Sequence, residues 1–119
     1  MFTGWKLSKD SQDMLMLKFP PKFPDVFAHH ITYMFGKNSE VPNDSDDIKV
    51  VGVCETDTIQ CLIIKIDGTT VRPDSGTYHI TWSIDKSKGA KPVDSNNAIK
   101  TNGFQSVADT PIKCIAKRF

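Results

Sequence analysis

Two apolar runs separated by a short polar break constrain the fold of this chain more than any other feature. Residues 48–55 and 58–66 are rich in Ile, Val, Leu and Cys, and only Thr56 and Asp57 stand between them. β-Branched side chains favour strands, and a break of this length joins antiparallel neighbours. The two runs therefore predict a β-hairpin, followed by a turn at Asp67-Gly68.

The remaining secondary structure is predicted from shorter signals. Four further segments have apolar patterns and boundaries typical of strands, at residues 2–7, 26–35, 77–84 and 111–116. Two segments are predicted as short helices, at residues 9–18 and 92–100. About six strands, with hairpins where connections are short, and two helices indicate an α+β domain whose sheets are largely antiparallel.

Local signals define where these helices begin and end. Ser8 is the expected N-cap of the first helix, and Asn102-Gly103 closes the second. The side chains of the first helix that are expected to face the core are Met14, Leu15 and Leu17. Three prolines between Phe19 and Asp25 exclude a helix there and predict a stiff connector. Polar loops are expected at residues 37–47 and 85–91.

The length and composition indicate one globular domain over residues 1–119. Hydrophobic residues make up 39% and charged residues 24% of the chain, and the formal net charge is +1. A chain of this size can build one hydrophobic core. A charge so close to zero does not favour the binding of bulk duplex nucleic acid through its backbone, whereas a small or single-stranded phosphate ligand remains compatible.

Signals for targeting or for disulfide chemistry are not found in the sequence. No apolar run follows a basic segment at the start, and no stretch approaches the length of about eighteen apolar residues that a membrane span needs. We therefore expect a cytoplasmic protein without a membrane partner. Cys54, Cys61 and Cys114 lack the spacing of a zinc site, so we predict that they are reduced and structural.

One short element occurs twice in the chain. Residues 28–33 and 77–82 both contain His-Ile-Thr followed by an aromatic residue, and both lie within predicted strands. Because side chains alternate across a strand, His30 shares one face with Thr32, and His79 shares one face with Thr81. Each strand is therefore predicted to present an imidazole beside a hydroxyl.

Two such strands facing each other would provide what the cleavage of a phosphodiester without a metal requires. One imidazole would remove a proton from the attacking water or hydroxyl, and the other would protonate the leaving oxygen. The two hydroxyls would donate hydrogen bonds to the non-bridging oxygens and stabilise the charge that develops in the transition state. The sequence does not say which histidine is the base.

The paired His-x-Thr motifs resemble those of the two-histidine (2H) phosphoesterase superfamily. The resemblance implies a compact bilobal arrangement, in which each lobe contributes one motif strand to a shared cleft. It also implies that His30, Thr32, His79 and Thr81 are the catalytic residues and that no metal or other cofactor is needed. The substrates it implies are cyclic phosphates, 2′-5′ linkages and related phosphodiesters, in RNA ends or in cyclic oligonucleotide signals.

Other residues near the motifs can be interpreted either as substrate-binding or as structural. Lys86 and Lys88, after the second motif, either bind the substrate phosphate or belong to a solvated turn, and Arg72 is a further candidate for binding substrate. Tyr33 and Trp82 are expected to pack in the core rather than to stack on a base.

His29 is the remaining histidine of the chain. It is expected to point to the strand face opposite His30 and to serve in packing or in hydrogen bonding. A metal site built from all three histidines is the alternative, although adjacent strand residues point apart.

The sequence thus predicts a metal-independent phosphodiesterase that acts on a nucleotide or an RNA end. The alternative is a non-catalytic module that binds a nucleotide or phosphate in the same cleft. A structural protein with incidental histidines is a third possibility, and it would need an exposed apolar patch in place of a polar cleft. No heptad or apolar helix face indicates an oligomeric state.

Overall fold

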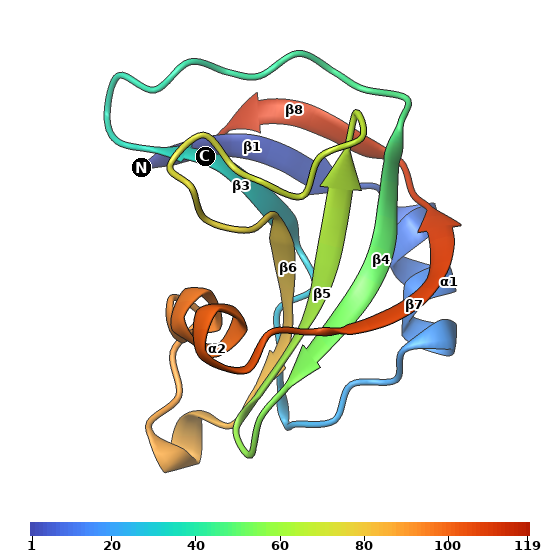
Figure 1. Ribbon diagram of the computed structural model, residues 1–119, viewed down its shortest axis with the longest axis vertical. Helices are drawn as coiled ribbons and strands as arrows, with labels where there is room; N and C mark the ends of the chain where they lie inside the picture. Colours follow the sequence, from blue (N-terminus) through green and yellow to red (C-terminus); the bar gives the residue numbers. More distant parts are fainter.

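The computed structural model describes residues 1–119 and consists of two antiparallel sheets and two α-helices (Figure 1). The smaller sheet has the order β3-β1-β8, with strands β1 (Phe2–Leu7), β3 (His30–Phe35) and β8 (Cys114–Arg118). The larger sheet has the order β2-β6-β5-β4-β7, with strands β2 (Asp25–Val26), β4 (Ile48–Glu55), β5 (Ile59–Ile66), β6 (His79–Ile84) and β7 (Gln105–Pro111). The helices are α1 (Lys9–Lys18) and α2 (Asp94–Asn102), and η1 (Lys86–Lys88) is a single 3-10 turn. The prediction of an α+β fold with antiparallel sheets and two short helices is confirmed.

The predicted hairpin forms the middle of the larger sheet. β4 and β5 pair antiparallel, and the Thr56 N–H donates to the Ile59 carbonyl oxygen at 2.8 Å across the turn between them. The turn after β5 places Asp67 at φ 49° and Gly68 at φ 85°. Both values lie in the left-handed region, which Asp and Gly adopt more readily than most residues, so the turn falls where the sequence predicted it.

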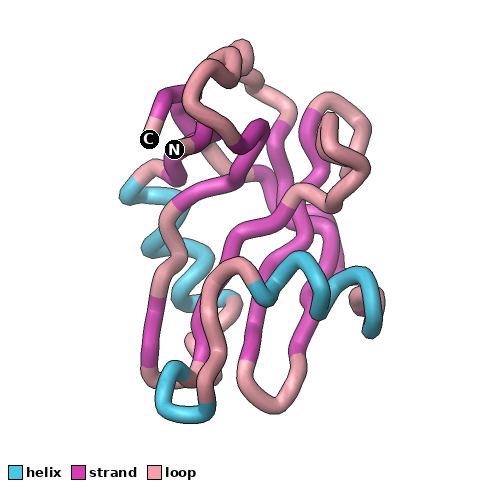
Figure 2. Tube along the Cα trace, turned by 90° about the vertical axis from the view of Figure 1, so that its left-hand side faces the viewer, coloured by secondary structure: helices cyan, strands magenta, loops and turns pink.

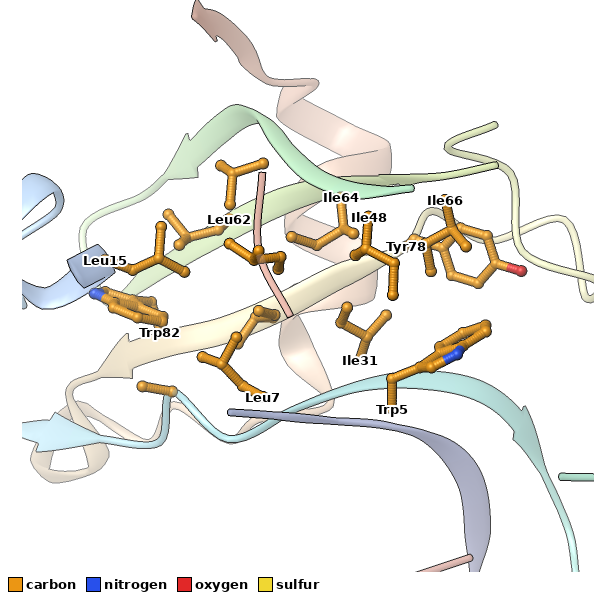
Figure 3. Close-up of a cluster of buried hydrophobic side chains, with 14 residues drawn as sticks. Trp5, Leu7, Leu15, Ile31, Ile48, Leu62, Ile64, Ile66, Tyr78 and Trp82 are labelled. Carbon is orange, nitrogen blue, oxygen red and sulfur yellow. The ribbon is translucent and has the colours of Figure 1, made fainter. Parts of the chain in front are cut away.

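The main hydrophobic core fills the space between the two sheets (Figure 3). Ile31 approaches from β3, and Leu62 and Ile64 approach from β5, and all three are fully buried. Trp82 of β6 is also fully buried there, and Tyr33 packs against the same cluster, which confirms the core role expected for both. A second cluster lies between α2 and the larger sheet, so α2 is fixed over β4 and β5.

Helix α1 has the predicted start but a different core face. Ser8 caps it, because its hydroxyl accepts from the Ser11 N–H at 3.2 Å. Leu15 is fully buried and Met14 packs against the core, as expected, but Leu17 is 86% exposed. Leu17 lies two positions after Leu15, about 200° around a helix, so the two side chains cannot face the same core.

The strand predicted over residues 26–35 is interrupted, and this correction matters for the site. Its first part is β2, which pairs with β6, and its second part is β3, which pairs with β1 in the other sheet. Between them Ala28 has a φ of 47° and its N–H donates to the Thr81 carbonyl oxygen at 3.0 Å. The chain therefore crosses from one sheet to the other at residues 27–29, and this crossing places β3 beside β6.

The C-terminal strands also differ from the prediction. β7 was not predicted, because it is an edge strand with mostly exposed and polar residues and has no apolar alternation. The strand predicted over residues 111–116 is displaced, since the chain leaves β7 after Pro111 and begins β8 only at Cys114. The three cysteines are free, as predicted.

The two ends of the chain lie side by side (Figure 2). The Phe119 N–H donates to the Phe2 carbonyl oxygen at 2.9 Å, and the two rings stack with centroids 4.6 Å apart. This packing matters for the site, because both rings also contact His30. None of the helices is long and apolar enough to span a membrane.

Candidate functional site

A cleft of about 220 Å³ is present where β3 of the smaller sheet lies against β6 of the larger sheet. Its wall includes both His-x-Thr pairs, which are His30 and Thr32 from β3 and His79 and Thr81 from β6. The residues between them, Ile31 and Ile80, are fully buried in one core cluster. Because neighbouring strand residues point to opposite faces, burying the isoleucines turns the imidazoles and hydroxyls toward the cleft. The structure thus brings the four predicted side chains together.

His79 is held by a hydrogen bond that fixes its tautomer. The ring is 9% exposed, and Nδ1 lies 2.8 Å from the carbonyl oxygen of Thr77. A carbonyl can only accept, so Nδ1 carries the hydrogen and Nε2 keeps the lone pair of the neutral ring. Burial lowers the pKa of His79, and the bond to Thr77 opposes this effect without overcoming it. Nε2 is therefore the atom of His79 that can exchange a proton with a ligand.

His30 is held by aromatic rings instead. Its ring centroid lies 4.7 Å from that of Phe2 and 5.2 Å from that of Phe119. Burial, followed by the charges of His29 and His79, lowers the pKa of His30 to about 4. His30 is therefore neutral at neutral pH and able to accept a proton.

The prediction that His29 faces away from His30 is wrong. Both side chains line the cleft, and their Nδ1 atoms lie 3.1 Å apart. The alternation rule fails because His29 precedes β3 and follows Ala28, whose positive φ turns the chain between the sheets. His29 thus belongs to the cleft and adds to the electrostatic environment of His30.

The hydroxyl of Thr81 contacts helix α2. Its Oγ1 lies 2.9 Å from Oγ of Ser95, which is fully buried, and 3.4 Å from the carbonyl oxygen of Pro92. When Ser95 donates to Thr81, the Thr81 hydroxyl hydrogen is used only in the long bond to the Pro92 carbonyl oxygen, which a ligand can replace. No pattern in the sequence indicated Ser95, because the contact depends on how α2 packs on β6.

Arg72 lies in the cleft wall with its charge partly balanced. Although only 4% exposed, it donates from Nε to Asp74 Oδ1 at 2.8 Å and from Nη2 to Asp74 Oδ2 at 3.0 Å. Nη2 also donates to Oδ1 of Asn96 at 3.0 Å. This guanidinium holds the pKa of the Asp74 carboxyl below its usual value. Nη1 makes no hydrogen bond within the chain, so it is left for an anionic ligand.

The structure does not bring Lys86 and Lys88 into the cleft wall. Both are exposed in η1, and Lys86 approaches the cleft only through Phe27, whose ring centroid lies 5.2 Å from Nζ. At about 3.3 Å per residue, the end of β6 already lies roughly 16 Å beyond His79. The reading of these lysines as a solvated turn fits this position better than the reading as a phosphate site.

Phenylalanine side chains that the sequence did not single out form the apolar part of the cleft. They are Phe2, Phe27 and Phe35. Phe35 reaches the cleft because β3 carries a bulge against β1, where Tyr33 has no partner. One extra residue reverses the alternation after the bulge, so Phe35 returns to the side of His30. The sequence contains one sign of this apolar wall. Phe2 is apolar although strand alternation places it on the face opposite the buried Trp5 and Leu7.

The three histidines do not form a three-ligand metal centre. No group of three or more His, Cys, Asp or Glu side chains is placed to hold a metal ion. No protein-family model matches this chain, and no curated protein or solved structure matches it significantly. The chemistry of the cleft therefore rests on its own geometry, which offers two imidazoles, two threonine hydroxyls, one guanidinium and aromatic faces.

Proposed function

We propose that this chain is a phosphodiesterase that cleaves a nucleotide phosphodiester by paired-histidine acid and base catalysis. The observation that supports the proposal most is the shared cleft, in which His30 and Thr32 from one sheet lie with His79 and Thr81 from the other. In each imidazole, Nδ1 contacts another group of the chain, and Nε2 takes no part in that contact. General acid and base catalysis needs two such groups on one ligand.

His30 is assigned as the base. Its pKa of about 4 keeps it neutral, and in the tautomer whose Nδ1–H donates to Nδ1 of His29, Nε2 carries the lone pair and accepts the proton of an attacking water or ribose hydroxyl. The attacking oxygen then forms a bond to phosphorus while the bond to the leaving oxygen breaks. The rings of Phe2 and Phe119 restrict the orientation of the His30 ring during this step.

His79 is assigned as the acid. In the protonated ring, Nδ1–H remains bonded to the Thr77 carbonyl oxygen and Nε2–H faces the leaving oxygen. That hydrogen bond favours the imidazolium, and the negative charge of a bound phosphate would favour it further. Transfer of the Nε2 proton to the leaving oxygen completes the reaction and leaves a neutral ring.

The remaining polar groups stabilise the phosphate. The hydroxyls of Thr32 and Thr81 donate to the non-bridging oxygens, and Nη1 of Arg72 provides a positive charge at the cleft wall. The arginine is already fixed by Asp74 and Asn96, so little reorganisation is needed when the phosphate binds. Metal ions are not required for either proton transfer in this scheme.

A nucleotide is favoured as the substrate because the cleft also has aromatic walls. Phe35 is 56% exposed, and Phe2 and Phe27 are partly exposed beside the histidines. Exposed aromatic rings stack on nucleobases without requiring a particular base. Phe35 offers most of the exposed ring area, although the Arg72 guanidinium lies 5.2 Å from its centroid, whereas Phe2 stacks on Phe119. A phosphodiester with a base attached uses both parts of the cleft.

The decisive test is hydrolysis in the presence of a chelator. The substrates are 2′,3′-cyclic nucleotides, 2′-5′ dinucleotides and cyclic oligonucleotides, each assayed with wild type, His30→Ala and His79→Ala. We expect each substitution to lower kcat/KM by about 10²-fold or more, the usual contribution of a general acid or base. Met34→Ala, an exposed change on the same strand as His30, is the matched control.

Two results would overturn the proposal. Turnover that survives in both histidine variants would exclude the paired-histidine mechanism. Tight binding of a nucleotide by the folded wild type, with no turnover of any substrate, would assign the cleft to a non-catalytic binding module instead.

A further inference from the structure

A second depression lies on the other side of Arg72 and Asn96 from the cleft. Its volume is about 660 Å³, and Arg72 and Asn96 line both spaces. We call it the Lys100 groove; it is formed by the loop of residues 72–77, helix α2 and Phe104. The cleft itself, at about 220 Å³, is smaller than most small-ligand pockets, which range over roughly 300–1,000 Å³. A substrate larger than one nucleotide would therefore extend into the neighbouring space.

The Lys100 groove contains polar groups that the fold does not use. Lys100 is exposed and makes no ion pair, and the exposed amide of Asn97 makes no hydrogen bond within the chain. Phe104 is 43% exposed, so part of its ring is accessible to a ligand. A cation, an amide and an open aromatic ring are groups that bind the phosphate, the base edge and the base face of a nucleotide.

The charges of the groove also suit one phosphate. Arg72 and Lys100 are positive, and the one carboxylate in the lining, Asp74, is already paired with Arg72. Asn96 and Lys100 are four positions apart on α2 and thus share one helix face. An anion bound by Lys100 would accordingly sit on the same side of α2 as the cleft.

The groove is connected to the acid of the reaction. Thr77 lines the groove, and its carbonyl oxygen is the atom that holds Nδ1 of His79. Nδ1 and Nε2 lie on opposite edges of the imidazole, so the ring of His79 stands between the groove wall and the oxygen that Nε2 protonates.

We propose that the Lys100 groove is a subsite for a second nucleotide, so that the substrate is a phosphodiester joining two nucleotides. This inference rests on the proposed function. The attacking oxygen forms a bond to phosphorus, the bond from phosphorus to the leaving oxygen breaks, and that oxygen takes the proton from His79. The dinucleotide unit can belong to a linear or a cyclic oligonucleotide, since both present the same chemistry to the groove.

The test compares substrates with and without a second nucleotide. We would measure kcat/KM for 2′,3′-cyclic AMP, for a linear 2′-5′ adenylyl dinucleotide and for a cyclic diadenylate, with wild type, Lys100→Ala, Lys100→Arg and Phe104→Leu. We expect Lys100→Ala and Phe104→Leu to lower kcat/KM about tenfold for a two-nucleotide substrate and to leave that for 2′,3′-cyclic AMP within twofold. Lys100→Arg should restore most of the loss. Lys113→Ala, which changes an exposed lysine outside the groove, is the matched control.

The result that overturns the subsite is an equal effect of Lys100→Ala on all substrates, or no effect on any of them. A wild type that cleaves none of them is a different result, because it overturns the proposed function. Binding then still tests the subsite. Calorimetry of the 2′-5′ dinucleotide with His79→Ala, with and without Lys100→Ala, is expected to show about tenfold weaker binding without the lysine, and an unchanged Kd would exclude the groove.

Discussion

The Nδ1 atoms of His29 and His30 lie 3.1 Å apart, and the planes of the two rings are inclined at 78°. Two neutral imidazoles can meet in this way, because one Nδ1 donates and the other accepts. If both rings were protonated, two N–H groups would point at each other and two positive charges would lie in contact. The contact therefore opposes protonation of both rings at once, and the charge of His29 adds to the effect of burial in lowering the pKa of His30.

The pH dependence of kcat/KM follows from this arrangement. The base must be unprotonated, so activity is gained as the pH rises through about 4, the pKa of His30. The acid must be protonated, and burial lowers the pKa of His79 from its ordinary value of 6.5. Activity is therefore lost again as the pH rises through a value below 6.5. We expect a bell-shaped profile of kcat/KM with its maximum on the acidic side of pH 6.5. A maximum above pH 7 would contradict the role assignment.

The stability of the fold should depend on pH through His30, whether or not the protein is an enzyme. The unfolded chain takes up a proton at His30 near pH 6.5, and the folded chain does so only near pH 4, so the unfolded state gains protons first as the pH falls. The free energy of unfolding is therefore expected to fall between pH 6.5 and 4, by up to about 3 kcal/mol for a shift of this size. Urea unfolding over this range checks it. His30→Gln should flatten the dependence more than His29→Gln, whose ring is less buried.

Gly76 is predicted to be essential for the position of Arg72. A Cβ at this position would lie 2.6 Å from Nη2 of Arg72 and 2.9 Å from Oδ1 of Asp74, so the buried guanidinium would have to move. We expect Gly76→Ala to lower kcat/KM about tenfold with little loss of secondary structure, as judged by circular dichroism. The control is Pro73→Ala in the same loop. In an Arg72→Lys background, Gly76→Ala should lower kcat/KM little further. If the losses from the two substitutions add in full, Gly76→Ala does not act by displacing Arg72.

Ser95 is predicted to act by positioning Thr81. Without the Ser95 hydroxyl, the bond that Thr81 donates to the Pro92 carbonyl oxygen is the one contact left to orient the Thr81 hydroxyl, and it competes with donation to the phosphate. Ser95→Ala should lower kcat several-fold and leave KM nearly unchanged, because the hydrogen bond of Thr81 matters most in the transition state. Ser87→Ala, in the exposed turn η1, serves as control. If Ser95→Ala still lowers kcat in a Thr81→Val background, the serine acts in another way.

The sequence predicted the elements that have strong apolar patterns and missed those without one. The hairpin of β4 and β5 could be predicted because nearly every residue of β5 is buried. β7 could not, because an edge strand exposes one side of its backbone and most of its side chains, and its pairing with β4 depends on tertiary structure.

The candidate site was predictable only where a strand is regular. His30 and Thr32, or His79 and Thr81, are two residues apart in an unbroken strand, so alternation placed each pair on one face. His29 and Phe35 lie just outside the regular part of β3. His29 directly follows Ala28, whose φ is positive, and Phe35 follows the bulge. Neither irregularity has a mark in the sequence, since Ala28 is not a residue that usually adopts a positive φ.

The isoleucine in each motif gives the core a direct influence on the spacing of the site. Ile31 and Ile80 are fully buried in the same cluster, and each lies between the histidine and the threonine of one His-x-Thr pair. Protein interiors are close-packed, so a change of volume at either isoleucine must be taken up by a movement of its strand. A substitution that looks conservative, such as Ile80→Val, thereby alters the separation of two imidazoles that it never touches. Tolerance to mutation in this chain is accordingly limited by interior volume as strictly as by the identity of the histidines.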